Sequence, residues 1–574
     1  MKRLAIIRKE YCHPDSCGNL CAKLCPINRK GEECIKIIGK AHISEELCIG
    51  CAICQNRCPF KAVSIVNLPE ELMKRLIYRY GDNGFALYSL PIPRFNSVLG
   101  LLGKNGIGKS TALEILSNKL KPNLGKKEAT ASEIKDFLKG SELFNYFEHI
   151  SNLKVAVKPQ NISQLSKYKI RVIDFLSKFG SQKDIKKLSE EMVISYNLER
   201  NMDELSGGEL QKVAVLAATM KEADVYFLDE PLTYLDISER IRVSDYIKEL
   251  SGKNKAVILI EHDLLLLDYV TDYVNIIYGK PGSYGIISDI RASKKAINTY
   301  LSGFLKEENI LFRDKEIKFN FGVRKKEDTA LLLEWPEFAK SYKNFKLKIK
   351  AGSINTKSVI GIAGKNGIGK TTFIKCLAGL IDSDEKNLKS KLEISYKPQY
   401  LEENSEELVA EIIQREKINK RLISLLSLED LFMRQLKQLS GGELQRLAIA
   451  ACLAKEADVY LIDEPSAFLD VEERIQAARA IEETMKEKES AAFVVDHDLL
   501  FLSYLADSLI VFSGQPAKEG KASNPYDIIS GLNELLRILD ITLRRDEESG
   551  RPRINKKGSV LDREQRRSGD LFEV

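Results

Sequence analysis

The chain has 574 residues, of which 44% are hydrophobic and 30% charged, and a formal net charge of +6. This length exceeds what one hydrophobic core supports, so we expect roughly three or four domains. No run of about 18 apolar residues occurs and the N-terminal apolar run is too short for a signal peptide, which predicts a cytosolic protein without a membrane span. The modest net charge gives little reason to expect a nucleic-acid partner.

Cysteine is concentrated near the N-terminus. Nine of the eleven cysteines precede residue 60, and in a reducing cytosol this density indicates metal binding rather than disulfides. Two runs of four, each closed by a proline, have the pattern with which bacterial-type ferredoxins hold iron–sulfur clusters. The runs are Cys12, Cys17, Cys21 and Cys25, and Cys48, Cys51, Cys54 and Cys58.

We therefore predict a small ferredoxin-like α+β domain over residues 1–67 with two 4Fe-4S clusters. In two-cluster ferredoxins the fourth cysteine of each run ligates the other cluster. Zinc is the alternative metal, although zinc sites seldom pair two proline-closed runs, and Cys34 is left over as a small buried or half-exposed residue. The ligand sets would be Cys12, Cys17, Cys21 and Cys58, and Cys48, Cys51, Cys54 and Cys25.

Two copies of one nucleotide-binding domain follow. KEADVYFLDEP (221–231) returns as KEADVYLIDEP (455–465), and GKNGIGKST (103–111) returns as GKNGIGKTT (364–372). Each glycine-rich turn between an apolar strand and a helix predicts a P-loop, in which backbone N–H groups and a lysine cradle phosphates and a hydroxyl supports magnesium. The predicted ligands are Gly103, Asn105, Gly106, Gly108, Lys109, Ser110 and Thr111, and Gly364, Asn366, Gly367, Gly369, Lys370, Thr371 and Thr372.

Four further side chains recur in register in both copies. An aspartate ends an apolar strand, where an acid that supports magnesium is needed, and the next glutamate is placed to polarise the attacking water. A histidine is expected at the γ-phosphate, and a glutamine at metal and water; merely solvated acids are the weaker interpretation. In that order they are Asp229, Glu230, His262 and Gln160, and Asp463, Glu464, His497 and Gln399.

The segment LSGGELQ, at 205–211 and 439–445, resembles the signature of ATP-binding cassette ATPases, and the resemblance covers roughly 75–285 and 330–513. In that family the signature lies at a helix N-terminus and contacts the γ-phosphate held by the other cassette's P-loop. A helix N-terminus is a natural binding site for an anion, so this arrangement is physically reasonable. The resemblance implies that Ser440, Gly441 and Gly442 complete the Lys109 site and that Ser206, Gly207 and Gly208 complete the Lys370 site. It also assigns Asp236 and Asp470 to a loop that couples the two sites.

The predicted fold class is therefore α/β, with tandem cassettes of the P-loop NTPase type behind the cysteine head. Adenine is expected to stack on an aromatic upstream of each P-loop, although core packing explains any one candidate equally well. The candidates are Phe85 or Tyr88 in the first copy and Tyr342 or Phe345 in the second.

The parts outside the repeat complete the domain plan. About 22 extra residues in the first copy include 132–150, which predict two short helices broken at Gly140, with Ser141 capping the second. They form either a tolerated surface insertion or an exposed docking element. The basic C-terminal tail is either solvated, or binds phosphates or staples the two cassettes. The plan is 68–285 for the first nucleotide-binding domain with its insertion at about 125–155, 286–325 for a hinge, 326–513 for the second domain and 514–574 for a C-terminal hinge and tail.

Taken together, the chain resembles the E subfamily of ATP-binding cassette proteins, the RNase L inhibitor family. The specific marks are the eight-cysteine head, FLKGSELFNYF, YGKPGSYGI and RRD…GRPRINKKGS…DREQ. The resemblance implies a cytoplasmic, monomeric ATPase that uses ATP, Mg²⁺ and two 4Fe-4S clusters. Such a protein splits ribosomes into subunits after termination, stays with the small subunit and is linked to initiation.

The partners implied by this resemblance are ribosomal RNA and proteins, a peptide-chain release factor or its recycling paralogue, and initiation factors, with no membrane. Closure of the cassettes would move the head as a rigid body. The alternative from another class is an ATP-coupled iron–sulfur redox enzyme, but the sequence contains no flavin or nicotinamide motif. A DNA-repair or chromosome-organising cassette ATPase would bring a long coiled coil or zinc modules.

Overall fold

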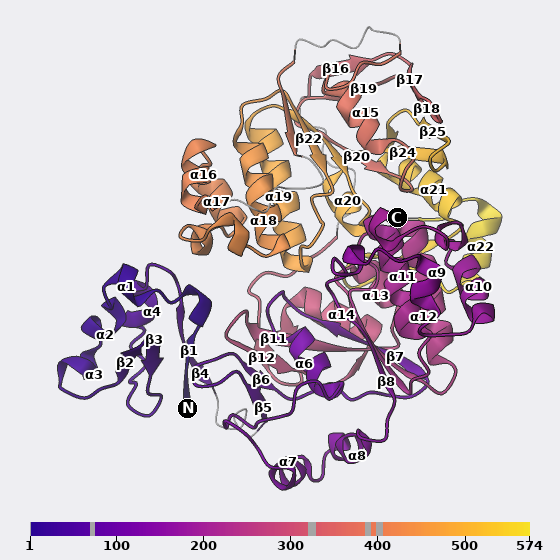
Figure 1. Ribbon diagram of the computed structural model, residues 1–574. Coiled ribbons are helices and arrows are strands. Elements are labelled where there is room, and N and C mark those ends of the chain that lie inside the picture. Colours follow the sequence, from indigo (N-terminus) through magenta and orange to yellow (C-terminus); the bar gives the residue numbers. More distant parts are fainter. Residues whose placement is uncertain (1, 69–74, 320–328, 385–391, 398–405, 574) are drawn as a thin grey trace.

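The computed structural model describes residues 2–68, 75–319, 329–384, 392–397 and 406–573. Figure 1 shows a small N-terminal head beside two larger α/β bodies, and the last residues of the chain return to the first of these bodies. Within the described residues no helix has the length and apolarity that crossing a membrane requires.

The first α/β body, below called the first cassette, is built on a sheet with the strand order β5-β6-β12-β11-β7-β10-β9-β8, and β13 pairs with β11. Its central strands run parallel. Strands β7, β9 and β10 are buried throughout, as parallel strands covered by helices on both faces must be. The strands are β5 Leu76–Arg79, β6 Ala86–Tyr88, β7 Ser97–Leu102, β8 Val155–Lys158, β9 Val225–Asp229, β10 Ala256–Ile260, β11 Tyr273–Lys280, β12 Tyr284–Ile287 and β13 Arg291–Ala292.

Several helices of the first cassette begin at a residue whose side chain caps the helix. Ser206 and Asp236 each form a capping box with the glutamate three residues on, which satisfies free N–H groups of the first turn. The helices are α6 Lys109–Leu116, α7 Ala131–Leu138, α8 Glu142–His149, α9 Val172–Leu176, α10 Gln182–Glu191, α11 Gly207–Thr219, α12 Ile237–Ser251 and α13 Leu264–Val270, with 3-10 turns η2 Leu165–Lys167, η3 Ser195–Asn197 and η4 Met202–Glu204.

The second cassette repeats this architecture, with the strand order β17-β18-β25-β24-β20-β23-β22-β21, and β26 pairs with β24. The equal order confirms the duplication predicted from the repeated segments. Its strands are β16 Leu331–Trp335, β17 Phe338–Tyr342, β18 Phe345–Ile349, β19 Gly352–Asn355, β20 Val359–Ala363, β21 Ile394–Lys397, β22 Val459–Asp463, β23 Ala491–Val495, β24 Ser508–Gln515, β25 Glu519–Ala522 and β26 Tyr526–Asp527. Its helices are α15 Lys370–Leu377, α16 Val409–Arg415, α17 Lys420–Leu425, α18 Gly441–Ala454, α19 Val471–Glu487 and α20 Leu499–Leu505, with η5 Glu429–Leu431 and η6 Leu436–Gln438.

The head mixes short helices with two small antiparallel sheets, β1 with β4 and β2 with β3. Its base is fixed to the first cassette, because the Asn83 side chain bonds to Ile43 and Ala5 and the Arg79 guanidinium pairs with Glu45. Its elements are β1 Lys2–Ile7, η1 Lys9–Tyr11, α1 Pro14–Cys17, α2 Leu20–Leu24, α3 Pro26–Arg29, β2 Ile35–Ile38, β3 Lys40–Ile43, α4 Ile53–Arg57 and β4 Val63–Leu68.

A hinge region joins the two cassettes. It packs β28 on α13, where Arg551 and Arg553 both bond to Asp268 of the first cassette. This part of the basic tail therefore staples the hinge to the first cassette, whereas other basic residues of the tail, such as Lys556 and Arg567, are exposed to solvent. Its elements are α14 Ser293–Ser302, β14 Phe304–Leu305, β15 Ile310–Leu311, α21 Ile528–Leu539, β27 Leu543–Arg545, β28 Pro552–Ile554 and α22 Val560–Ser568.

Three predictions need correction. Both sheets run past the expected ends at 285 and 513, because β12, β13, β25 and β26 return along their edges. The two inserted helices form as predicted, but their aromatic face packs on the first cassette: Tyr146 donates its hydroxyl proton to the Leu116 carbonyl at 2.7 Å. Ser141 stands at the N-cap without capping, since its hydroxyl bonds back to Leu138.

Candidate nucleotide sites and cysteine cavities

The first P-loop joins β7 to α6. Gly106 and Gly108 have φ angles of 68° and 101°, which glycine adopts without strain. The ammonium group of Lys109 is buried and donates to the carbonyls of Gly103 and Lys104, both at 2.8 Å. Burial lowers the pKa of Lys109. Backbone N–H groups, helix start and lysine thus suit a phosphate chain.

The second P-loop repeats this geometry between β20 and α15. Gly367 and Gly369 have φ angles of 70° and 96°. The Lys370 ammonium donates to the carbonyls of Gly364 at 2.9 Å and Lys365 at 2.6 Å. Burial lowers the pKa of Lys370 to about 8. The remaining predicted loop residues, Asn105, Thr111, Asn366 and Thr372, lie in or directly after the two loops.

A hydroxyl and a carboxylate converge beside each lysine. Ser110 Oγ lies 2.9 Å from Asp229 Oδ2, and Thr371 Oγ1 lies 2.9 Å from Asp463 Oδ2. Burial raises the pKa of both aspartates, and the neighbouring glutamate adds to the effect. An added divalent cation would compensate this buried charge, so the hydroxyl–carboxylate pairs fit the magnesium prediction.

Glu230 has a strained backbone conformation, and its side chain lies beside two predicted partners, Gln160 and His262. Its φ of 47° is left-handed and uncommon outside glycine, and Glu464 has the same value. Gln160 Nε2 donates to Glu230 Oε1 at 2.7 Å, and His262 Nε2 lies 3.5 Å from that oxygen. Burial opposes ionisation, but hydrogen bonding to His262 and the charges of Lys109 and Lys158 outweigh it, so the pKa of Glu230 is about 2.

The histidines complete the arrangement. Burial lowers the pKa of His262, so its imidazole is neutral near pH 7. His497 Nε2 lies 3.5 Å from Glu464 Oε1, which repeats the geometry of the first copy. Gln399 lies outside the described residues.

Two buried lysines were not predicted as site residues. The Lys158 ammonium donates to the carbonyls of Asp229 at 2.8 Å and Glu230 at 3.0 Å, and the Lys397 ammonium donates to the Asp463 carbonyl at 2.8 Å. Burial lowers the pKa of each to about 8. Both lysines begin the tripeptide KPQ, which recurs in register in the two copies, so this repeat is the sequence signal that indicates them.

The two cassettes contact each other through the predicted coupling loops. The backbone N–H of Asn105 donates to Asp470 Oδ2 at 3.0 Å, and that of Asn366 donates to Asp236 Oδ2 at 2.9 Å. The aromatic rings of Tyr234 and Phe468 meet edge to face between the loops. Each P-loop is therefore bonded to the other cassette, as two composite sites require.

The signature residues start α11 and α18. Ser206 and Ser440 donate their hydroxyl protons to Glu209 at 2.8 Å and Glu443 at 3.0 Å of their own helices. The second glycine of each signature leaves no space for a side chain. A Cβ on Gly208 would lie 2.9 Å from the Tyr234 carbonyl oxygen, and a Cβ on Gly442 would lie 2.8 Å from that of Phe468. The other signature glycines, Gly207 and Gly441, face the rings of those same two residues.

The four candidates for stacking on adenine differ in the solvent exposure and position of their side chains. Tyr88 is fully buried in β6 and cannot stack on a nucleotide, so that alternative is wrong. Phe85 lies against Gly108 of the first P-loop, and Phe345 lies against Gly369 of the second. Tyr342 is 46% exposed.

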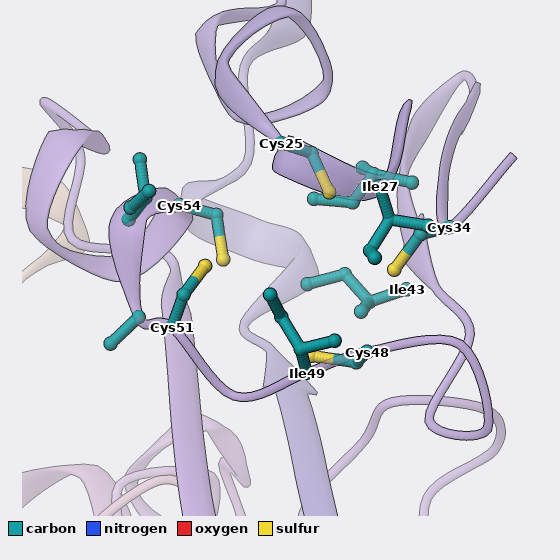
Figure 2. A pocket seen from close by; sticks show the side chains of 11 residues that line it. Cys25, Ile27, Cys34, Ile43, Cys48, Ile49, Cys51 and Cys54 are labelled. Atoms are coloured by element: carbon teal, nitrogen blue, oxygen red, sulfur yellow. The ribbon is translucent and has the colours of Figure 1, made fainter. Parts of the chain in front are cut away.

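The cysteines of the head surround two small cavities. Cys12, Cys17, Cys21 and Cys58 line one cavity, and Cys25, Cys48, Cys51 and Cys54 line the other, which Figure 2 shows. These are the same two groups of four that the ferredoxin pairing predicts. Cys34 lines the second cavity as well and is 2% exposed, so it packs beside a predicted ligand set.

The cavities fit a cluster better than a single ion. In the described part of the chain no three His, Cys, Asp or Glu side chains converge as ligands of one metal ion. Four thiols spread around a common cavity suit the larger four-iron cluster, whereas a zinc site needs four ligands within bonding distance of one point.

The fold and these sites define a protein with two P-loop cassettes that share their interface, preceded by an iron–sulfur type head. Sequence profiles agree. The ABC transporter family matches residues 90–233 and 343–467, the possible Fer4-like domain in RNase L inhibitor matches 3–33, and the 4Fe-4S binding domain matches 41–64.

Full-length relatives identify the family. The chain is 45% identical to an uncharacterized ABC transporter ATP-binding protein of Methanocaldococcus jannaschii, over 100% of this chain and 98% of that protein. It is 39% identical to the translation initiation factor RLI1 of Saccharomyces cerevisiae, over 99% and 98%. A structure of ribosome-bound archaeal Pelota and ABCE1 matches with a TM-score of 0.95 and 44% identity, over 100% and 99%. The chain belongs to the E subfamily of ATP-binding cassette ATPases, the RNase L inhibitor family.

Proposed function

We propose that this protein hydrolyses ATP at two composite sites and uses closure of its cassettes to split ribosomes into subunits after termination. The observation that carries the proposal is the reciprocal bonding of each P-loop to the opposite coupling loop, from Asn105 to Asp470 and from Asn366 to Asp236. Neither site lacks a catalytic glutamate or a histidine.

Each side chain has a role in this proposal. Lys109 and the loop N–H groups hold the phosphates, Ser110 and Asp229 hold Mg²⁺, and Glu230 orients the attacking water. A carboxylate with a pKa of about 2 remains ionised at neutral pH and can polarise that water. The second site repeats these roles.

The signature of one cassette completes the site of the other. In this proposal Ser440, Gly441 and Gly442 approach the nucleotide on Lys109 when the cassettes close, and Ser206, Gly207 and Gly208 approach the nucleotide on Lys370. The start of a helix favours an anion, which supports this placement of α11 and α18.

We assign two 4Fe-4S clusters to the head, one in each cavity. The metal–thiolate bonds would cross-link a domain that has a small core of its own, so the head would move as a rigid body when the cassettes close. Cytoplasmic ribosomes, chiefly the small subunit, are the proposed partner. A release factor or its paralogue and initiation factors are the further proposed partners. The names of the yeast relative and of the Pelota complex support these assignments.

Glu230→Gln and Glu464→Gln, made singly in the full chain, test the proposal. Each should bind ATP like the parent and hydrolyse it more slowly, with unequal effects because only the first cassette carries the inserted helices and the head. ATP binding, phosphate release and dissociation of ribosomes on sucrose gradients should be measured on the same preparations.

Parental hydrolysis in both variants would refute the catalytic assignment. A redox enzyme predicts a different result, in which splitting or hydrolysis depends on whether an intact cluster is oxidised or reduced.

A further inference from the structure

The head also touches the second cassette, through one aromatic ring. Tyr11 ends the turn η1 and immediately precedes Cys12, a predicted cluster ligand. The guanidinium carbon of Arg434 lies 3.8 Å from the centroid of the Tyr11 ring, and that of Arg8 lies 5.1 Å from it. The Arg434 side chain is 7% exposed, so this cation–π contact is largely shielded from water.

Arg434 connects this ring to the signature of the second cassette. Its Nη1 donates to Glu443 Oε1 at 2.7 Å. The other oxygen of Glu443 accepts the backbone N–H of Ser440 at 2.9 Å and its hydroxyl at 3.0 Å. The Nε of Arg434 is buried and has no hydrogen-bond partner within the described residues.

The first cassette has the same arginine and glutamate, but within the described residues no aromatic ring makes a cation–π contact with this arginine. Tyr196 instead donates its hydroxyl proton to the glutamate, Glu209, at 3.4 Å. Arg200 and Glu209 stand at the corresponding positions, and Arg200 Nη1 lies 3.6 Å from Glu209 Oε1. Asn197 donates to that oxygen instead, at 2.8 Å. The head therefore adds a contact to one signature, which makes the two sites inequivalent.

We propose that Tyr11 and Arg434 couple the position of the head to the ATP site formed by Lys109 and Ser440, and leave the other site uncoupled. The inference rests on the proposed composite sites. While the head is docked, Arg434 holds Glu443, and Glu443 holds the Ser440 hydroxyl away from any ligand. Nucleotide that recruits Ser440 weakens this chain and frees the head, and by reciprocity a displaced head favours nucleotide at that site.

Variants of the full-length, iron-loaded chain test this coupling. Tyr11→Leu removes the ring face and keeps an apolar side chain, whereas Tyr11→Phe keeps the face and should behave like the parent. In a Lys370→Ala background, where only the Lys109 site binds, Tyr11→Leu should tighten ATP binding by up to about 30-fold, the size of one cation–π contact shielded from water. In a Lys109→Ala background the same substitution should change nothing.

Hydrogen exchange of residues 9–12 provides the second measurement. ATP should raise exchange there in the parent and in Tyr11→Phe. Arg434→Leu should raise it without ATP, but the matched Arg200→Leu should not.

Each outcome decides the inference. Equal effects of Tyr11→Leu on both sites, or none on the Lys109 site, would overturn it while leaving composite sites intact. If instead Lys109→Ala and Lys370→Ala leave ATP binding unchanged, the proposed sites themselves are wrong and the inference falls with them.

Discussion

Replacing Lys158 by methionine should separate catalysis from stability. The side chain is 1% exposed, and its ammonium donates to the carbonyls of residues 229 and 230, which fixes the strained backbone of the proposed catalytic glutamate, Glu230. Lowering its pKa from 10.5 to about 8 corresponds to about 3 kcal/mol against the buried charge. Its two charge-assisted hydrogen bonds stabilise the folded state by roughly 1.5–3 kcal/mol each. The cost of burying the charge and the gain from these bonds therefore offset each other to within a few kcal/mol.

We therefore expect a small change in unfolding midpoint but a loss of about tenfold to a hundredfold in hydrolysis, the cost of a misplaced catalytic group. The assay is steady-state phosphate release in a Glu464→Gln background, which reports the first site. Lys154→Met is the matched control, because Lys154 precedes the same strand and is 62% exposed. Parental turnover by the Lys158 variant, with its fold intact, would refute the positioning role.

Two further predictions concern the head and the cassette interface. Cys54→Ser removes one thiolate from the cavity in Figure 2, so the chain should lose iron and splitting activity but keep basal ATP hydrolysis, and full splitting by an iron-depleted head would contradict the rigid-body account. Asp263 caps α13, and burial, with Asp498 nearby, raises its pKa to about 7. Between about pH 4 and pH 7 the folded protein therefore keeps this proton, whereas the unfolded chain loses it. The free energy of unfolding should fall as pH rises through this range. Asp263→Asn should reduce this dependence on pH in denaturant unfolding.

Most of the nucleotide chemistry could be predicted from the sequence, because it lies in short segments that repeat. A P-loop fixes its lysine and hydroxyl by local geometry, so Lys109 and Ser110 lie where their spacing predicts. The cysteine groups follow for the same reason, since their spacing reflects a known mode of ligation.

What could not be predicted depends on contacts between distant segments. Nothing near Tyr11 in the sequence indicates that its ring would meet Arg434 of the second cassette. The sequence does not indicate that Tyr88 is buried inside the first cassette, where it cannot stack on adenine. The repeat also fades near the ends of both sheets, where the edge strands depend on pairing rather than on motif.

The return of the C-terminal strand to α13 has a consequence for how the molecule is made. Domains generally fold as units, from the N-terminus onward, during synthesis. Asp268 of the first cassette is translated long before its partners Arg551 and Arg553, which follow both cassettes in the chain. The hinge can therefore close only after both cassettes have been synthesised, so a product truncated before residue 551 would carry both P-loops yet leave a buried carboxylate without its two arginines.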